Sequence, residues 1–460
     1  MNHGPSEILE PSRRTPVLGE YDVVVLGGGP AGIAAAAAAG RTGRSTILIE
    51  RYGFLGGAGT AAGLSTFCGL HANIHGEHKQ VIHGLADEIL DRLQKMDGLN
   101  APHLSLANKI TAQAYDISAY KIAADGLLTS SGVKVLFHAF GVGMSKRAER
   151  EIDTLIVESK SGRQAIRGRL FIECSGDGDL AAWAGAPFEL GDGAGNMLYP
   201  STMFRIIGVD PVKAGRAWDA IPKLMDEAIA KGRKFPRRGA IVRPQKNPIE
   251  WRANVTQIKN PDGSAVSGID VEQMSYGEIE GRRQCWDVFE FIKSVTPGFE
   301  NAYIVEIAPQ IGIRETRRVV GEYMLSESDI LECASFPDSI GVNGWPVEAH
   351  VSGNVALKFP KIPESRGYNQ LPYRMIVPRA VDNLFMAGRC ASMTHDGQSS
   401  ARVSGPCFAM GQAAGTAADL ALKAGVAPRD VDVRALQRRL QADGVFLGEP
   451  AESLRSHATA

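Results

Sequence analysis

A glycine-rich turn between a buried strand and a helix constrains the fold more than any other feature of the chain. Residues 21–26 form a β-branched apolar run without polar alternation, which is typical of a parallel strand buried on both faces. A G-x-G-x-x-G motif follows at Gly27, Gly29 and Gly32, and an alanine run then extends to Ala39. We expect Gly27 to allow a tight turn, Gly29 to admit a pyrophosphate, and Gly32 to bring the helix close to the strand.

The helix start and an acid further along the chain complete a dinucleotide-binding pattern. The first helical turn contains Pro30 and Ala31 and presents unpaired N–H groups and a partial positive charge to a phosphate. A second predicted strand, residues 45–49, ends at Glu50, about 20 residues after Gly29. An acid at this place accepts hydrogen bonds from the ribose hydroxyls of a bound dinucleotide.

A second glycine-rich segment, directly after Glu50, favours FAD over NAD. The chain continues from Arg51 through Gly56 and Gly57 to Thr60, whereas a nicotinamide dehydrogenase continues with another helix and strand. Such a loop can follow the pyrophosphate and ribityl chain of a longer cofactor. A flexible surface loop is the alternative, but it would place the apolar pair at residues 54–55 in water.

Two later segments also end predicted strands next to glycines. Strands predicted within residues 133–172 lead to Gly176 and Asp177, where an ordinary turn is the alternative. A short strand over residues 383–386 leads to Gly388 and Arg389. We expect both strand ends to bring backbone close to the nucleotide.

The segment after Arg389 predicts a polar loop and then a helix rich in small residues. The helix contains Gly411 and Gly415, which allow close packing on the sheet. We expect its N-terminal region, residues 401–405 beginning with Ala401, to direct a positive dipole end toward the pyrimidine ring of a flavin.

These segments together resemble the glycine-rich FAD-dependent oxidoreductase family, which is related to flavoproteins of the glutathione-reductase and fumarate-reductase type. The resemblance covers about residues 20–425 and implies FAD as the cofactor. It also implies an α/β fold with a Rossmann-like FAD-binding domain, built from a parallel sheet and a β-meander, and an inserted mixed α+β substrate domain. Many relatives have an acid where this chain has Arg389. The matching motifs lie at residues 27–32, 50–60, 175–179, 314–318, 371–374, 387–390 and 411–415.

The order of these motifs predicts a discontinuous FAD-binding domain. The expected parts are the FAD-binding domain at residues 20–75, 110–200 and 375–425, the inserted domain at 201–374, an excursion of uncertain place at 76–109, a loose N-terminal extension at 1–19, and a C-terminal helix and tail at 426–460.

The composition argues against several other classes of protein. Lys and Arg total 50 and Asp and Glu total 51, so no strongly basic surface for nucleic acid or anionic membranes is expected. The sequence has neither an apolar run of about 18 residues nor a signal-peptide pattern, which predicts a cytoplasmic protein. The six cysteines form no C-x-x-C pair, so we expect free thiols in a reducing compartment and no metal site.

Several side chains are candidates for binding or chemistry at the flavin. Tyr373 and Arg374 precede the return to the FAD-binding domain, so they are expected at the domain junction, where ligand sites are common. His395, in the polar loop, is a candidate base or a partner of a flavin carbonyl, and a surface histidine is the alternative. Arg314, Arg317 and Arg318 are candidate anion binders or members of an internal ion-pair network. Cys68 either faces the flavin or is a buried structural cysteine.

The sequence therefore predicts an FAD-dependent dehydrogenase, reductase or oxidase of a small organic substrate. We expect the reactive site at the seam between the domains, lined by Gly56, Gly57, Arg374 and His395, and an anionic group on the substrate. The single fingerprint predicts no built-in nicotinamide domain, and it leaves open oxygen, a quinone, a carrier protein or NAD(P)H as the electron partner, as well as a homo-oligomer. A tRNA-modifying flavoenzyme and an electron-transfer subunit of a larger complex are the alternatives, and the near-zero charge weighs against the former.

Overall fold

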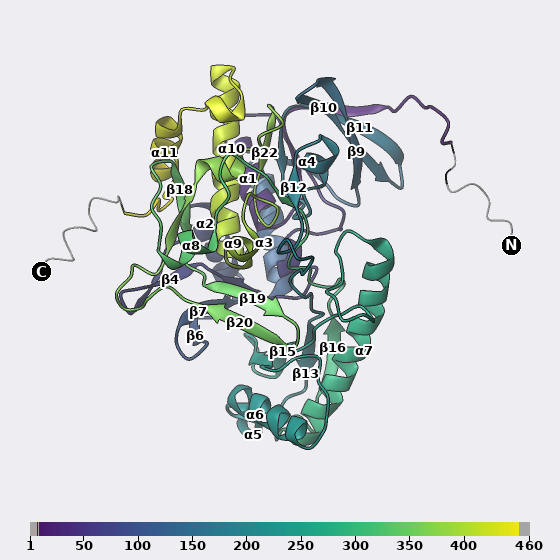
Figure 1. Cartoon of the computed structure of the whole chain (residues 1–460), viewed down its shortest axis with the longest axis vertical. Helices are drawn as coiled ribbons and strands as arrows, with labels where there is room; N and C mark the ends of the chain where they lie inside the picture. Colours follow the sequence, from purple (N-terminus) through teal and green to yellow (C-terminus); the bar gives the residue numbers. More distant parts are fainter. Residues whose placement is uncertain (1–6, 8, 450–460) are drawn as a thin grey trace, which may run out of the picture.

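Five mutually parallel strands form the middle layer of the larger of two lobes in the computed structural model, which describes residue 7 and residues 9–449 (Figure 1). The central strand, β1, pairs with β2 on one side and β11 on the other. The order across the parallel layer is β8 (Lys134–Leu136), β2 (Thr46–Ile49), β1 (Val17–Leu26), β11 (Gly162–Glu173) and β22 (Leu384–Met386).

The side chains of β1 alternate between two apolar cores. Val23 and Val25 pack in the core beneath the helices, whereas Val24 and Leu26 pack in the core on the opposite face of the sheet. All four side chains are buried, which explains why this strand has no polar alternation. The parallel arrangement expected from the sequence is therefore present.

The opposite face carries the predicted β-meander. β9 (Phe140–Ala148) and β10 (Glu151–Ser159) run antiparallel to each other, and β10 pairs with the first half of β11. The second half of β11 pairs with β22 in the parallel layer. β11 thus belongs to both the parallel layer and the meander.

Helices cover the other face of the parallel layer. They are α1 (Pro30–Gly40), α2 (Leu85–Lys95), α3 (Ile117–Ser130) and α10 (Ser404–Ala424), and α10 runs down the larger lobe in yellow in Figure 1. α1 and α10 make the closest contact: a Cβ on Gly411 would collide with the carbonyl oxygen of Ala31, and one on Gly415 with that of Ala35. The small residues of the predicted helix therefore serve close packing, as expected.

A second sheet forms the middle of the smaller lobe, and all its strands fall within residues 201–374. Its strands are all antiparallel, in the order β14 (Ile241–Pro244), β15 (Glu250–Asn254), β13 (Phe204–Ile207) and β16 (Tyr303–Ile307). This sheet shares a separate core with α6 (Ala217–Ala230) and α7 (Val271–Val295), and α7 lies along the outer edge of the lobe in Figure 1. The short α5 (Pro211–Ala214) precedes α6.

The end of the inserted segment belongs to the larger lobe, which corrects the boundary expected at residue 374. Leu325, Ile340 and Leu371 pack in the same core as α1 and α10. The elements of this part are β17 (Arg318–Val319), α8 (Glu327–Leu331), β18 (Ser339–Asn343), β19 (Val347–Val351), β20 (Asn354–Lys358), β21 (Asn369–Pro372) and the 3-10 helix η2 (Tyr373–Ile376). Burial of these apolar side chains against α10, not chain order, decides the division.

The excursion expected at residues 76–109 also finds its place in the larger lobe. Leu85, Ile89 and Leu93 of α2 are buried in its core. Short strands precede and follow this helix in the sequence: β3 (Thr66–Cys68), β4 (His71–Ile74), β5 (Glu77–Gln80), β6 (His103–Ser105) and β7 (Ile110–Ala114). The remaining short elements are the 3-10 helices η1 (Gly57–Gly59) and η3 (Pro428–Asp430), α4 (Asp179–Trp183), β12 (Phe188–Glu189) and α9 (His395–Ala401).

The two ends of the chain differ from the expected boundaries by a few residues. β1 begins at Val17, so the expected N-terminal extension is shorter than residues 1–19, and its residues 1–6 and 8 lie outside the described part. The C-terminal helix is α11 (Val433–Ala442), and residues 450–460 of the expected tail are likewise outside it. No helix among the described residues is long and apolar enough to cross a membrane.

Candidate cofactor and substrate site

An elongated cavity begins at the carboxyl ends of β1, β2 and β11 and extends toward the second sheet. At its first end lie Glu50, Ala139, Phe140 and Gly141. The N-terminus of α1 lines its middle, and the segment before α10 lines its far end. Ligands bind at this edge of parallel α/β sheets because the strand ends and helix N-termini meet there.

The turn before α1 leaves room for a ligand against its backbone. Gly27 has φ = +101°, and a side chain at this position would collide with the carbonyl group of Cys174. At Gly29 an added Cβ would meet only the Cα of Gly57, at 3.7 Å. Because Gly29 is the N-cap of α1 and no side chain caps the helix, the N–H groups of its first turn remain available for phosphate.

Glu50 is fixed at the end of β2 by backbone donors. Its Oε2 accepts a hydrogen bond from the Gly28 N–H (2.7 Å) and its Oε1 accepts one from the Tyr52 N–H (3.0 Å). Burial raises the pKa of this carboxyl, and the backbone hydrogen bonds partly oppose the rise. A carboxylate has lone pairs for further donors, so Glu50 can still accept hydrogen bonds from ribose hydroxyls.

An ion pair joins two strand ends in the middle of the cavity. Arg389, which follows β22, donates from Nη2 to Oδ1 of Asp177 (2.7 Å) and from Nη1 to Oγ1 of Thr316 (2.8 Å). Both Asp177 and Arg389 line the cavity, as do Gly176 and Gly388. The arginine that replaces the acid of many relatives therefore carries its own acid partner.

The far end of the cavity is apolar except for a few unsatisfied polar atoms. Phe67 and Tyr115 form part of the wall, with ring centroids 4.2 Å apart. Thr66 Oγ1 and Arg402 Nε are buried and have no hydrogen-bond partner among the described residues. Burial lowers the pKa of the Arg402 guanidinium. A buried cation and hydroxyl without partners mark a place where a polar ligand group fits.

The N-terminus of α10 opens on the same end. Val403 is the N-cap residue, no side chain caps this helix, and Ser404 and Cys407 line the cavity. The N-terminus of α10 thus faces the cavity. Ala401, however, ends α9 and does not line the cavity.

Most of the sequence-predicted cofactor residues meet at this cavity. Those that line it are Gly27, Gly29, Pro30, Ala31, Glu50, Arg51, Gly57, Gly176, Asp177, Gly388 and Arg389. Three others support its walls without lining it. Gly32 allows α1 to pass over the Gly27 carbonyl, Gly56 adopts φ = +112°, and Thr60 Oγ1 donates to the Leu55 carbonyl oxygen (2.7 Å).

The predicted position of Tyr373 and Arg374 beside the cavity is wrong. Tyr373 is buried in the core, where its hydroxyl donates to the Pro428 carbonyl oxygen (2.6 Å). Arg374 Nε pairs with Asp338 Oδ2 (2.9 Å), and neither Tyr373 nor Arg374 lines the cavity. Because residues 325–374 fold against α10, the chain has already left the seam between the lobes before it reaches them.

His395 and one of the three candidate arginines, Arg318, form a separate polar network. Both bind the fully buried Glu315: Arg318 through an ion pair, and His395 through Nδ1 at 3.0 Å. Arg317 instead pairs with Asp179 (2.8 Å), which lines the cofactor cavity. His395 does not line the cofactor cavity, so the expected position of this residue beside the flavin is also wrong.

Sequence reasoning missed the side chains at the far end. Arg402 lies inside the very segment, residues 401–405, whose backbone was expected to face a flavin. A lone basic residue in this run of small residues was the available signal. Thr66 and Tyr115 carried none, because β3 and β7 are short and pair only in the folded chain.

Comparison with known proteins decides the family. A family model described as FAD dependent oxidoreductase matches residues 22–440. The chain belongs to the FAD-dependent oxidoreductase family. It is therefore an enzyme with FAD as its cofactor, as the motifs predicted, and the cavity fits that group because it offers a ribose acceptor, an open helix N-terminus and a long apolar end.

Solved structures with a similar chain course have low sequence identity. p-Nitrophenol 4-monooxygenase from Pseudomonas putida is 12% identical, with a TM-score of 0.48 over 96% of this chain and 92% of that one. A geranylgeranyl bacteriochlorophyll reductase-like protein from Thermoplasma acidophilum is 13% identical, with a TM-score of 0.46 over 92% of this chain and 82% of that one. No curated protein matches the sequence significantly.

Proposed function

We propose that this enzyme oxidises or reduces a small organic anion at the far end of the cavity, with Arg402 binding the anionic group. The observation that carries the proposal is the state of Arg402: it lines the cavity, burial lowers the pKa of its guanidinium, and its Nε is shielded from solvent without a hydrogen-bond partner among the described residues. Leaving a donor of a cation desolvated and unpaired is unfavourable, and an anion at this place compensates it.

Glu348 acts on Arg402 through its charge but forms no ion pair with it among the described residues. The Glu348 carboxylate is bound by Trp345 Nε1 (2.8 Å) and by His350 Nε2 (3.3 Å). Arg402 reaches only the Glu348 backbone carbonyl oxygen, at 3.5 Å. Its guanidinium therefore retains donors for a carboxylate, which it can bind with two parallel hydrogen bonds.

The same proposal assigns the cofactor-binding residues. Glu50 binds the adenosine ribose, the first turn of α1 binds the pyrophosphate, and the first turn of α10 faces the flavin pyrimidine ring. Bound FAD supplies the hydride or electron transfer, while the protein binds, orients and excludes water. The positive dipole end of α10 and the Arg402 charge both favour negative charge at this end of the cavity.

The electron partner is a separate molecule under this proposal. The sequence contains one complete G-x-G-x-x-G motif with its strand, helix and acid, so no second nucleotide domain is assigned. The described cysteines are free, which fits a cytoplasmic enzyme. Oxygen, a quinone, a carrier protein and diffusing NAD(P)H all remain candidates.

An anaerobic substrate screen tests the proposal. FAD-loaded enzyme is mixed with small carboxylates, neutral analogues and amines of matched size, and flavin bleaching is followed at equal concentrations. We expect reduction by anions, with a loss of about 100-fold or more in Arg402→Gln. Arg282→Gln is the matched control because Arg282 lies on the exposed side of α7, paired with Glu278. Reduction by neutral compounds alone, or an unaffected Arg402→Gln, would overturn the proposal.

A further inference from the structure

The second sheet carries a row of charged side chains across all four of its strands. The register pairs Glu306 with Arg205, Arg205 with Arg252, and Arg252 with Arg243. Directly opposite residues project from the same face of a sheet, with Cβ atoms about 5 Å apart. Arg205 is neutralised, because its Nε donates to Glu250 (2.6 Å) and its Nη1 to Glu306 (3.1 Å).

Neither Arg252 nor Arg243 forms an ion pair among the described residues. Burial lowers the pKa of Arg243, and the charge of Asp219, which is itself paired with Arg216, only partly opposes this. Arg252 donates only to the Leu64 carbonyl oxygen (2.8 Å), although it is 5% exposed, and its Nε is unpartnered. Arg243 reaches only the carbonyl oxygens of Val242 (3.3 Å) and Trp218 (3.5 Å). Like charges placed directly opposite destabilise a sheet, and burial adds to the cost. An anion between the two guanidinium groups removes both penalties.

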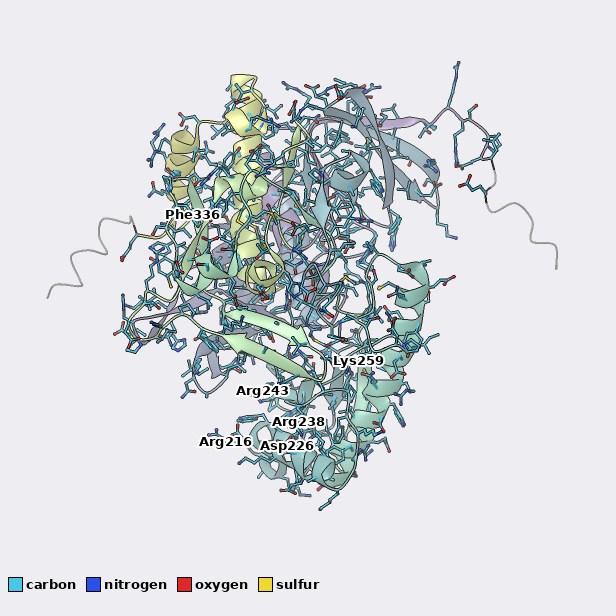
Figure 2. All side chains as sticks on the ribbon, in the orientation of Figure 1. Arg216, Asp226, Arg238, Arg243, Lys259 and Phe336 are labelled. Carbon is cyan, nitrogen blue, oxygen red and sulfur yellow. The ribbon has the colours of Figure 1, made fainter. Side chains whose placement is uncertain are left out.

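A second cavity of about 660 Å³ opens onto this pair. Its walls include Asn100, whose Oδ1 is buried without a partner, and the Trp218 ring, which lies 6.0 Å from the Arg243 guanidinium carbon. Figure 2 labels Arg243 in the smaller lobe, near the base of the molecule. The cavity therefore combines an apolar wall with two cations that form no ion pair in the described part of the chain, and its one lining carboxylate, Asp219, is paired with Arg216 (2.7 Å). The two guanidinium groups suit an organic oxyanion, whereas Asn100 Oδ1 can accept a hydrogen bond from a hydroxyl or amine of the same molecule.

Strand β3 contributes to the walls of both cavities. Thr66, its first residue, lines both the second cavity and the far end of the cofactor cavity, and its buried Oγ1 has no partner within the described chain. Two residues along the strand, burial raises the pKa of the Cys68 thiol, and the charges of both Arg252 and Arg402 partly oppose this rise. The Arg402 end of the cofactor cavity therefore adjoins the cavity that contains the Arg243–Arg252 pair.

We propose that the second cavity binds a second oxyanion, a carboxylate or a phosphate, at the distal end of the molecule that reacts at the flavin. The substrate is then a dianion, held by Arg402 at its reacting end and by Arg243 and Arg252 at the other. This inference rests on the proposed function, because it takes Arg402 as the site of the first anionic group.

Calorimetric titration of the FAD-loaded enzyme with inorganic phosphate and with acetate, at low ionic strength, tests the site itself. We expect wild type to bind at least one of the two anions and Arg243→Gln to bind it about 10-fold or more weakly. Arg243→Lys should retain part of the affinity, and Arg282→Gln all of it. Preference for phosphate or for acetate identifies the chemistry of the distal group. Arg243, which is less buried than Arg252, is the variant expected to fold normally.

A parallel titration of Arg402→Gln separates the two proposals. Binding that survives in Arg402→Gln and fails in Arg243→Gln supports the second site. Two results overturn the second site and leave the proposed function intact: binding that is lost only in Arg402→Gln, or a wild-type affinity no higher than that of Arg243→Gln. With a reducing anion from the screen in hand, the binding anion should slow flavin bleaching competitively. Tight binding without any competition would overturn the assignment to a substrate end.

Discussion

Arg389 Nη2 lies 2.7 Å from Asp177 Oδ1, so a cation and an acid from two different strand ends neutralise each other in the middle of the cofactor cavity. Removing either partner leaves the other charge partly buried in the cavity proposed to hold the diphosphate of FAD. Arg389→Gln leaves the Asp177 carboxylate without its partner, and its repulsion of the phosphates should weaken FAD binding by about 10-fold or more. Asp177→Asn leaves the Arg389 guanidinium, which attracts the phosphates, so this variant should weaken FAD binding less.

A fluorescence titration of apoprotein with FAD measures this difference. The double variant provides the cycle that isolates the coupling between the two side chains. Equal losses in both single variants would mean that the pair acts only by holding the strand ends together.

Two glycines of the fingerprint should respond differently to the same substitution. A Cβ at Gly29 makes only an ordinary contact with the Gly57 Cα, at 3.7 Å, so Gly29→Ala should fold and fail to retain FAD. A Cβ at Gly32 collides with the Gly27 carbonyl oxygen, so Gly32→Ala should lose about 1–3 kcal/mol of stability with or without cofactor. Denaturant unfolding of both apoproteins, with absorbance at the flavin band, checks the pair. An apo Gly29→Ala that unfolds as easily as Gly32→Ala would contradict the ligand role of Gly29.

Arg374 should tolerate truncation. Its side chain is 46% exposed and its ion pair with Asp338 lies away from the cofactor cavity. Arg374→Ala is expected to keep its FAD and its rate of flavin reduction, with a loss of stability below about 1 kcal/mol. Tyr373→Phe should cost about 1 kcal/mol through the lost hydrogen bond to Pro428, again without a kinetic effect. A large drop in rate for Arg374→Ala would return this residue to the active site.

His395 should make stability depend on pH. Burial lowers its pKa, but the hydrogen bond and charge of Glu315, aided by Asp396 and opposed by Arg318, leave the pKa raised. The folded protein thus favours protonated His395, whose contribution is full below the unfolded histidine pKa of about 6.5 and is lost as pH rises through the folded value. The difference in Tm between wild type and His395→Asn should shrink from pH 5.5 to pH 8.5. A difference that is constant with pH would show that the pair is not ionic.

The sequence predicted the first part of the fold because local patterns determine it. The apolar run that includes Val23 and Val25 predicts a strand buried on both faces, and Gly29 and Glu50 stand at the spacing that dinucleotide binding requires. The position of Tyr373 was mispredicted because it depends on long-range packing: residues far apart in the chain bury it against α10. The opposed pair Arg243 and Arg252 was missed for the same reason, since only strand register brings the two side chains together, whereas Arg402 stood in a segment already expected to face the flavin.

The contact between α1 and α10 has a consequence for the choice of cofactor. Gly411 and Gly415 bring the two helix backbones together, so the helix ends that open on the middle and the far end of the cavity are held at a fixed separation. The helix pair therefore sets the length of the ligand that can contact both helix ends. Under the proposed assignment, a flavin without any phosphate reaches only the end of α10, whereas a flavin with a phosphate on its ribityl chain can occupy both helix ends at once, and Glu50 is left to recognise the adenosine half.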